Sequence, residues 1–195
     1  MKIITISGAS GSGKSTLAHY IHSMAKNSLL LSIDRYYLSK VEQLSKNGFF
    51  NFDEPKSLDL DYLEKNILEI KSNGTAQVPI YDFTVSERAG METLNAESLV
   101  IIDGLFAGSL LKDKSDLNIY VDVGLDLAIL RRIDRDIKER GRTLESVVEQ
   151  YMRDVRPSFY KHIEPIKSIA DIVITNNHDP DQMIKEAKAI IEKLR

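Results

Sequence analysis

The sequence predicts an α/β domain in which a parallel β-sheet is flanked by helices. Short apolar runs rich in β-branched residues alternate with longer stretches whose apolar residues recur every three or four positions, as in successive βαβ units. Several of the short runs are apolar throughout, which is typical of strands buried on both faces of a sheet. The expected strands cover residues 2–7, 28–33, 77–81, 99–102, 118–123 and 171–174.

The helices that should cover this sheet are predicted from apolar residues that recur at helical spacing and from capping residues at the helix ends. In residues 57–72 the apolar positions fall on one helix face, and Gly74 follows where the helix should stop. The last helix should begin at Asp179, a capping residue, with Pro180 in its first turn. The expected helices cover residues 15–26, 57–72, 126–140 and 143–156 and the segment from residue 179 onward.

Composition and charge indicate a soluble globular chain that forms one domain, residues 1–195. Of its 195 residues, 43% are hydrophobic and 28% are charged, close to the average of soluble proteins. The formal net charge of −3 argues against a broad basic surface for nucleic acid or anionic membrane. The lack of cysteine excludes disulfides, thiolate metal sites and a cysteine nucleophile. No apolar run approaches the ~20 residues that span a bilayer, so we expect a cytoplasmic protein without nucleic-acid or membrane partners.

Two long segments, residues 35–56 and 82–97, lack a clear period. Irregular stretches longer than ~12–15 residues within a compact domain are usually functional or disordered. Their aromatic content is too high for plain disorder. We therefore expect functional loops. The aromatic residues are Tyr36, Tyr37, Phe49, Phe50, Phe52 and Phe83.

A phosphate-binding loop is predicted at residues 8–15. The sequence GASGSGKS fits G-x-x-x-x-G-K-[ST] and lies between an expected strand and an expected helix. Glycines let backbone N–H groups turn toward phosphate oxygens, and the following helix adds its positive dipole end. Lys14 should reach the β- and γ-phosphates, and the Ser15 hydroxyl should bind Mg²⁺. The sheet is thus expected to be of the P-loop NTPase type. The predicted nucleotide-binding residues are Gly8, Ala9, Ser10, Gly11, Ser12, Gly13, Lys14, Ser15 and Thr16.

Two carboxylates follow expected strands. Asp103 comes after an apolar strand, as does the metal-binding carboxylate of P-loop proteins, although Asp also forms turns at such positions. Asp34 follows the strand at residues 28–33, at the sheet edge where ligands bind in open α/β sheets. Asp34 could accept the proton of an attacking hydroxyl, or it could cap a helix or turn.

Seven of the ten arginines fall between residues 131 and 156, whereas lysine dominates elsewhere. Guanidinium groups bind phosphate in a bidentate manner and neutralise charge during phosphoryl transfer. Arg132 and Arg135 share a helix face, and Gly141 marks a break between helices, so residues 131–156 could form a small Arg-rich lid. The alternative is a row of surface ion pairs on an exposed helix. The acidic partners would then be Asp136, Glu139 and Asp154.

Taken together, these motifs resemble those of the uridine kinase (uridine-cytidine kinase) family. They occur in the order and spacing of that family and extend over almost the whole chain. Besides the P-loop they are SIDRYY from residue 32, NFDEP from 51, PIYDF from 79, ERGR from 139, QY from 150, RPSF from 156 and IADIVI from 169.

The resemblance implies phosphorylation of a nucleoside 5′-hydroxyl, most often of uridine or cytidine, with ATP or GTP as the donor and Mg²⁺ as the metal. Asp34 then matches the catalytic base, with Lys14, Arg132 and Arg135 as further catalytic residues and Arg140 as a nucleotide contact. Ser15 and Asp103 match the metal-binding positions. The positions that match nucleoside-binding residues are Asp34, Tyr37, Asp53, Tyr81, Phe83, Ser86, Arg132, Arg142 and Gln150.

The same resemblance implies acceptor-binding loops at residues 35–56 and 81–97 and a homo-oligomer. The chain departs from the family pattern at two positions. Ser86 stands where the family typically has a His that reads the pyrimidine edge, and Asp103 stands where it commonly has Glu. A hydrogen-bonding edge can reject a wrong substrate by a large factor, so Ser86 puts base identity in question.

Two other functions are compatible with these residues. A related kinase could phosphorylate another small hydroxyl compound, such as nicotinamide riboside, a pantothenate-like molecule or a sugar phosphate, and the change at Ser86 motivates this alternative. A nucleotide-dependent regulatory switch would bind ATP without phosphorylating an acceptor. That second alternative leaves Asp34, Asp53 and the aromatic loops without a purpose.

Overall fold

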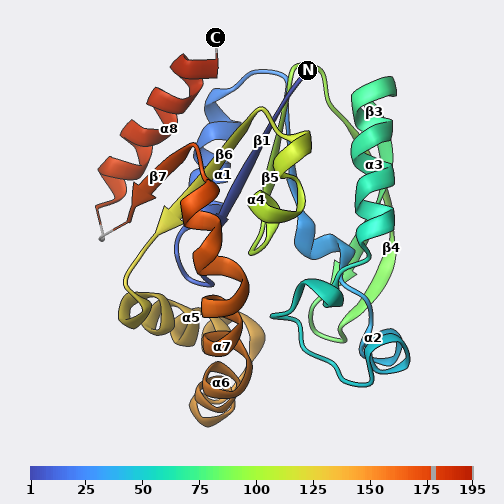
Figure 1. The fold of residues 1–195 in the computed structure, drawn as a ribbon, viewed down its shortest axis with the longest axis vertical. Coiled ribbons are helices and arrows are strands. Elements are labelled where there is room, and N and C mark those ends of the chain that lie inside the picture. The colour runs from blue at the N-terminus through green and yellow to red at the C-terminus, as the bar shows by residue number, and fades with distance from the viewer. Residues whose placement is uncertain (177–178, 195) are drawn as a thin grey trace.

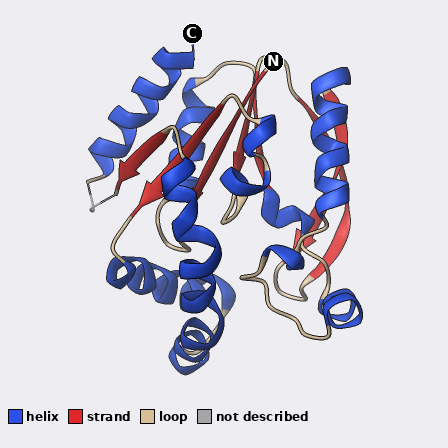
Figure 2. Ribbon diagram, viewed as in Figure 1, coloured by secondary structure: helices blue, strands red, loops and turns tan. Residues whose placement is uncertain are grey.

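The structure, a computed structural model, describes residues 1–176 and 179–194. Its centre is a five-stranded parallel sheet with strand order β2-β5-β1-β6-β7 (Figures 1 and 2). This sheet confirms the fold class expected from the sequence, and each strand begins and ends within one residue of its expected range. The strands are β1 (Lys2–Gly8), β2 (Ser28–Ser32), β5 (Leu99–Asp103), β6 (Leu117–Asp122) and β7 (Ile172–Thr175).

Helices connect the strands and cover both faces of the sheet (Figure 2). The α-helices are α1 (Lys14–Met24), α2 (Lys40–Asn47), α3 (Leu60–Asn73), α4 (Ala107–Leu110), α5 (Leu125–Arg140), α6 (Leu144–Gln150), α7 (Arg156–Ser158) and α8 (Pro180–Leu194). The 3₁₀ segments are η1 (Ile33–Tyr36), η2 (Pro55–Ser57), η3 (Lys112–Lys114) and η6 (Glu164–Ile169), and the π-helical segments are η4 (Tyr151–Val155) and η5 (Phe159–Ile163).

Alternating side chains of the strands build one apolar layer on each face of the sheet. Ile4 and Ile6 of β1 lie in a layer shared with α1 and α8. Ile3 of the same strand lies in the opposite layer, which includes residues of α3, α4 and η6. Because successive side chains of a strand point to opposite faces, fully apolar strands require this three-layer arrangement.

The expected strand at residues 77–81 is not part of the parallel sheet, which corrects the sequence-based topology. It belongs to β3 (Thr75–Asp82), which pairs antiparallel with β4 (Glu87–Asn95) in a separate two-stranded sheet. The β4 strand lies in a segment that the sequence suggested was irregular. Most of its residues are exposed, so it shows no clean alternation of apolar and polar positions.

The other segment expected to be irregular, residues 35–56, contains the short helix α2. A capping box begins this helix: the Ser39 hydroxyl accepts from the Glu42 N–H, and the Glu42 carboxylate accepts from the Ser39 N–H. The capping box fixes the helix start even though α2 buries little apolar surface. Gly48, at φ 76°, ends the helix.

The arginine-rich segment folds as α5 and α6, joined at Gly141, and continues through η4 and α7 into η5. The expected helix over residues 143–156 is therefore interrupted: regular α-helix ends at Gln150 and π-helical turns follow. These helices lie beyond the sheet edge at which β1, β2 and β5 end (Figure 1). Among the residues that the structure describes, no helix has the length and apolar character needed to cross a membrane.

Removal of a core side chain should cost far more stability than removal of an exposed one. Ile101 in β5 is fully buried, so we expect Ile101→Ala to lower the free energy of unfolding by about 2–5 kcal/mol. Leu68 on α3 is 58% exposed, and Leu68→Ala should change it by about 0.5 kcal/mol or less. Urea unfolding of both variants measures the difference. Equal losses would contradict the placement of Ile101 in the core.

Candidate active site

The segments that carry the predicted chemistry meet at one sheet edge because β2, β5 and β1 are parallel and in register. Asp103, at the end of β5, pairs with Ile6 of β1 on one side and with Ser32 of β2 on the other. The P-loop and Asp34 therefore leave the sheet on the two sides of Asp103. Ligands of open parallel sheets bind at this edge, where the strands end.

The P-loop adopts a conformation that depends on its glycines. Gly11 and Gly13 have φ angles of 85° and 92°, which residues with a Cβ atom avoid. A Cβ on Gly11 would collide with the backbone carbonyl of Ala128 in α5. Because α1 begins directly after Gly13, its unpaired N–H groups and positive dipole end face the loop. The local geometry suits an anion, as the sequence predicts for residues 8–16.

Lys14 and Asp34 lie close enough to influence each other's protonation. Lys14 is only 9% exposed, and its ammonium group donates to the Ala9 carbonyl at 3.4 Å. Burial lowers the pKa of Lys14, although the carboxylates of Asp34 and Asp103 oppose this effect. Burial raises the pKa of Asp34 to about 6, although Lys14 acts in the opposite direction. A carboxyl group with this pKa can accept a proton near neutral pH.

Capping does not account for the Asp34 side chain. The N-cap of η1 is Ser32, whose hydroxyl accepts from the backbone N–H of Asp34 at 3.4 Å. Within the described part of the chain, the Oδ1 atom of Asp34 is buried without a hydrogen-bond partner. A buried acceptor that lacks a donor is costly, so this geometry favours a role toward a ligand.

Ser15 and Asp103 form an oxygen-rich pair beside the P-loop. The Ser15 hydroxyl donates to Oδ2 of Asp103 at 2.6 Å, and Asp103 is 6% exposed. This contact favours the metal-binding interpretation of Asp103 over that of a turn former, because the carboxylate faces the P-loop helix. Hydroxyl and carboxylate oxygens are ligands that Mg²⁺ accepts, so the pair fits a magnesium–nucleotide complex.

Four of the predicted lid arginines surround the carboxylate of Asp136 in α5. The ion pairs of Arg132 and Arg140 with Asp136 at i, i+4 spacing form as the surface-pair alternative expected, but Asp136 is fully buried, so they do not lie on an exposed helix face. The shortest contact joins Arg135 Nη2 to Asp136 Oδ1 at 2.8 Å. The other three ion pairs with Asp136 are those of Arg132 at 3.6 Å, Arg140 at 3.4 Å and Arg142 at 3.6 Å.

Two further arginines of this segment make different kinds of contact. Arg153 is 61% exposed and pairs with Glu149 at 3.7 Å and Asp154 at 2.8 Å, so it fits the surface-pair interpretation. Arg131 instead donates to the backbone carbonyl of Gly11 at 3.3 Å and thereby ties α5 to the P-loop. No pattern in the sequence distinguishes these two arginines.

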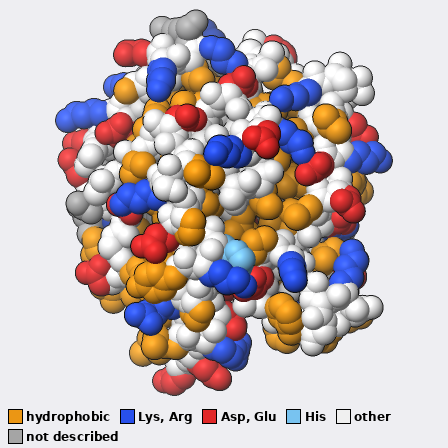
Figure 3. Space-filling model, viewed as in Figure 1, with side chains coloured by type: hydrophobic (Ala, Val, Ile, Leu, Met, Phe, Trp, Pro, Cys, Tyr) orange, Lys and Arg blue, Asp and Glu red, His pale blue; other side chains and the backbone are white. Residues whose placement is uncertain are grey.

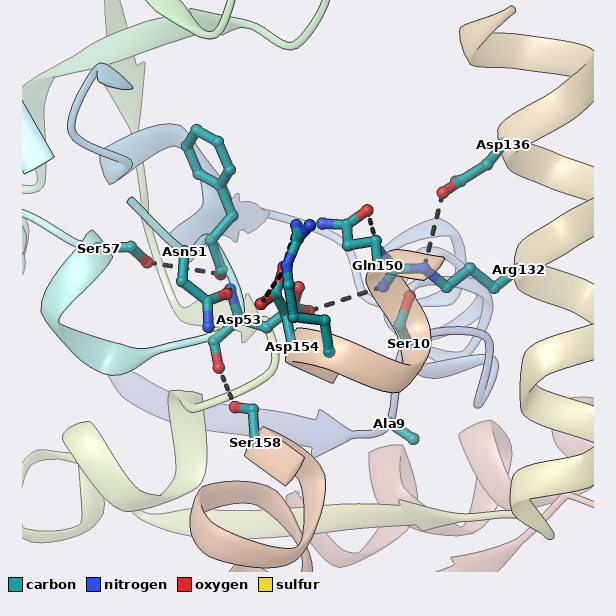
Figure 4. A network of polar contacts seen from close by, with 12 residues as sticks. Ala9, Ser10, Asn51, Asp53, Ser57, Arg132, Asp136, Gln150, Asp154 and Ser158 are labelled. Carbon is teal, nitrogen blue, oxygen red and sulfur yellow. Dashed lines mark hydrogen bonds and ion pairs between the residues drawn. The ribbon is translucent and has the colours of Figure 1, made fainter. Parts of the chain in front are cut away.

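Asp53 is buried and faces Arg132 of α5. The two side chains approach to 3.6 Å, and Arg132 also donates to the Gln150 amide oxygen at 3.3 Å (Figure 4). The Ser158 hydroxyl donates to the Asp53 carbonyl, which anchors this loop on α7. Burial raises the pKa of Asp53, and Arg132 opposes the shift. A buried, weakly compensated carboxylate next to an amide oxygen can accept hydrogen bonds from sugar hydroxyls.

Aromatic rings from three segments form a continuous wall near Asp34. Tyr37 contacts Phe52 edge to face at 5.3 Å between ring centres and Tyr81 at 5.8 Å, and Tyr81 contacts Phe83 at 5.1 Å. Arg140 lies over the Phe83 ring at 5.5 Å. Flat rings at such spacings provide faces on which a planar group can stack. Figure 3 shows a notch in the surface between α2 and the helices of the arginine-rich segment, α5 and α6.

Other predicted residues have less direct geometry. Ser86 lies in the turn between β3 and β4 with φ 59°, and its neighbour Tyr81 has a buried hydroxyl without a hydrogen-bond partner in the described chain. Tyr36 is a core residue, because it is fully buried and its hydroxyl donates to Asn66 at 2.9 Å. Asp136 was not predicted as a site residue, since its i, i+4 spacing to arginines is the same on any charged helix.

Comparison with known proteins agrees with this geometry. Residues 3–182 match the family described as the Phosphoribulokinase / Uridine kinase family. The chain belongs to this family. Uridine kinase of Borrelia duttonii is 35% identical over 100% of this chain and 96% of its own length, and that of Staphylococcus carnosus is 40% identical over 88% and 86%. The resemblance inferred from the motifs is thus confirmed at the level of the family.

Solved structures confirm the fold. Phosphoribulokinase from Rhodobacter spheroides superposes with a TM-score of 0.62, covering 89% of this chain and 69% of that protein at 21% identity. D-glycerate 3-kinase from Cryptococcus neoformans gives a TM-score of 0.63, covering 85% and 79% at 19% identity. Both contain the parallel sheet architecture described above within proteins of low sequence similarity.

The raised pKa of Asp34 should be visible in the stability of the protein. Because burial raises this pKa from 3.8 to about 6, ionised Asp34 destabilises the folded state above about pH 6. We expect Asp34→Asn to be more stable than the unsubstituted protein at about pH 8, with the advantage vanishing as the pH falls toward about 4. Urea unfolding across this range measures the effect.

Asp113 provides the matched control, since it is exposed in η3. Asp113→Asn should show no comparable dependence on pH. An advantage of Asp34→Asn that is the same at both ends of the pH range would mean that the Asp34 carboxyl has an ordinary pKa.

Proposed function

We propose that this protein is a nucleoside kinase that transfers the γ-phosphoryl group of ATP or GTP to the 5′-hydroxyl of uridine or cytidine. The observation that carries the proposal is the Asp34 carboxylate beside Lys14, whose Oδ1 atom is buried without a hydrogen-bond partner among the described residues. Relatives named uridine kinase match nearly the full length of the chain, which supports the nucleoside as the acceptor.

The donor nucleotide would bind at the P-loop. The N–H groups at the start of α1 and the Lys14 ammonium would hold its phosphates, and Ser15 and Asp103 would hold Mg²⁺. The metal supplies neutralisation of phosphate charge when it is bound. Arg135 is placed to contact the transferred group, because its guanidinium already reaches Ser10 of the P-loop at 3.4 Å.

The acceptor would bind between Asp53, Gln150 and the aromatic wall. Asp53 and Gln150 would accept hydrogen bonds from the ribose hydroxyls, and Tyr37, Tyr81 and Phe83 would contact the base. Holding both substrates in line lowers the entropic cost of the transfer by up to ~7–11 kcal/mol. Asp34 then takes the proton of the 5′-hydroxyl as that oxygen bonds to the γ-phosphorus and the bond to the nucleoside diphosphate breaks.

Replacement of the proton acceptor should separate binding from chemistry. We expect Asp34→Asn to lower kcat by about 10²–10⁴-fold, because the amide cannot take the proton, while the affinity for Mg-ATP stays within about threefold. Steady-state kinetics and nucleotide titration measure the two effects. Asp113→Asn is again the control and should retain normal turnover. Near-normal turnover of Asp34→Asn would remove Asp34 from this role.

A panel of acceptors should identify the substrate. With ATP or GTP and Mg²⁺, we expect uridine or cytidine to give a kcat/KM at least about 10²-fold above those of pantothenate and sugar phosphates. Purine nucleosides and nicotinamide riboside belong in the panel, because Ser86 leaves the base edge without a large hydrogen-bonding side chain. Slow ATP hydrolysis that no acceptor stimulates would instead indicate a nucleotide-dependent switch.

A further inference from the structure

Asp136 is an acidic residue that the proposed reaction does not use directly. It lies inside α5 and is fully buried, although this helix ends at the exposed Gly141 break. A buried carboxylate is strongly unfavourable unless cations and hydrogen-bond donors compensate it. Four guanidinium groups do so here, and they come from both sides of the break: Arg132, Arg135, Arg140 and Arg142.

The two oxygens of this carboxylate serve different arginines. Oδ1 accepts from Arg135 Nε at 3.0 Å and Nη2 at 2.8 Å and lies 3.4 Å from Arg140. Oδ2 lies 3.6 Å from both Arg132 and Arg142. Oδ1 therefore faces Arg135 and Arg140, whereas Oδ2 faces Arg132 and Arg142 through ion pairs alone, since it has no hydrogen-bond partner among the described residues.

The arginines of this cluster reach different parts of the site. On the Oδ1 side, Arg135 reaches Ser10 of the P-loop at 3.4 Å. On the Oδ2 side, Arg132 reaches Asp53 at 3.6 Å and donates to Gln150 (Figure 4). Arg142 also donates to Gln150. One buried carboxylate thus links the loop for the phosphate donor to the residues for the acceptor.

The charge of the cluster is also unbalanced. Four arginines surround Asp136, and one of them also approaches Asp53. Even with both carboxylates ionised, the cluster keeps an excess of two positive charges. Guanidinium groups held together in this way are prepared for a multiply charged anion, provided that something fixes their spacing.

We infer that Asp136 is the positioning residue that keeps the four arginines in the geometry required for phosphoryl transfer. This inference rests on the proposed function. Asp136 contacts neither substrate; it orients Arg135 toward the donor and Arg132 and Arg142 toward the acceptor. It also holds Arg140, which lies over the Phe83 ring of the aromatic wall at 5.5 Å. Charge that develops between the substrates then meets groups that need no reorganisation.

Asp136→Asn, compared with Asp134→Asn, tests this role. Asp134 lies on the same helix, is 61% exposed and, among the residues that the structure describes, pairs only with Lys138, at 2.6 Å. It therefore controls for loss of a carboxylate from α5. In Asp136→Asn an amide NH₂ would face one pair of arginines. We expect kcat to fall about 100-fold, while the KM for ATP rises only about fivefold because the P-loop and Lys14 are intact. Asp134→Asn should remain normal.

Asp136→Glu provides a second variant that keeps the charge but shifts it by one methylene. We expect its kcat to be about tenfold below that of the unsubstituted protein and therefore above that of Asp136→Asn. A folded Asp136 variant with kcat within about threefold of the control, or with changes in KM alone, would overturn the positioning role. If Asp136→Asn does not fold, as judged by circular dichroism, the kcat of Asp136→Glu decides.

Failure of the proposed function would give a different result. In that case the unsubstituted protein and Asp134→Asn would both transfer no phosphoryl group to any nucleoside. The dissociation constant of Mg-ATP then tests Asp136 on its own, and we expect about a fivefold weakening in Asp136→Asn because Arg135 is no longer held toward the P-loop. Equal dissociation constants in both variants would overturn the inference.

Discussion

The register of three parallel strands is the constraint on which the site depends. Asp103 is hydrogen-bonded in register between Ile6 and Ser32, so one carboxylate lies between the start of the P-loop and the start of η1. A shift of one residue in either pairing would reverse the faces of the side chains and move Asp103 away from Ser15. The apolar layers on both faces oppose such a shift, because it would expose core residues. Packing of the sheet thus fixes the distance between Asp103 and Asp34, the positions proposed to bind the metal and to accept the proton.

Burial at this sheet edge shifts the pKa values of the basic and acidic groups in opposite directions. It lowers the pKa of Lys14 and raises that of Asp34, and their mutual attraction opposes both shifts. Asp34 therefore remains able to take a proton at a pH where an exposed carboxylate would be a poor base. On the side of the site opposite Asp34, the excess positive charge around Asp136 adds to the attraction for phosphate. The site combines a basic cradle for the donor with one carboxylate whose basicity is raised by its surroundings.

The sequence predicts the parts of this site that depend on local pattern. The P-loop and the strand before it are predicted from consecutive residues. The strand is β1, and the loop lies between β1 and α1 as expected. The hairpin was missed because β4 is largely exposed and polar, so neither its period nor its apolar content distinguishes it from a loop. Asp136 was missed for another reason. Its spacing to the arginines is identical in a surface helix. Its burial depends on tertiary contacts, in which the surrounding arginines reach Ser10, Gln150 and Asp53.

Donor and acceptor sites differ in how they are built. The donor site is formed by the central strands and the helix that follows, within the packed core. The base-binding wall instead depends on β3 and β4, a hairpin outside the sheet that is held by contacts such as the hydrogen bond from Tyr62 to the Gln77 carbonyl at 3.0 Å and the ion pair of Arg88 with Asp59 at 2.9 Å. A substitution in the hairpin turn, at Ser86 for example, can therefore change which planar group is accepted. It would not disturb the register of β1, β5 and β2, which aligns the P-loop with Asp34. This separation agrees with the description of the family, which names two kinases, phosphoribulokinase and uridine kinase.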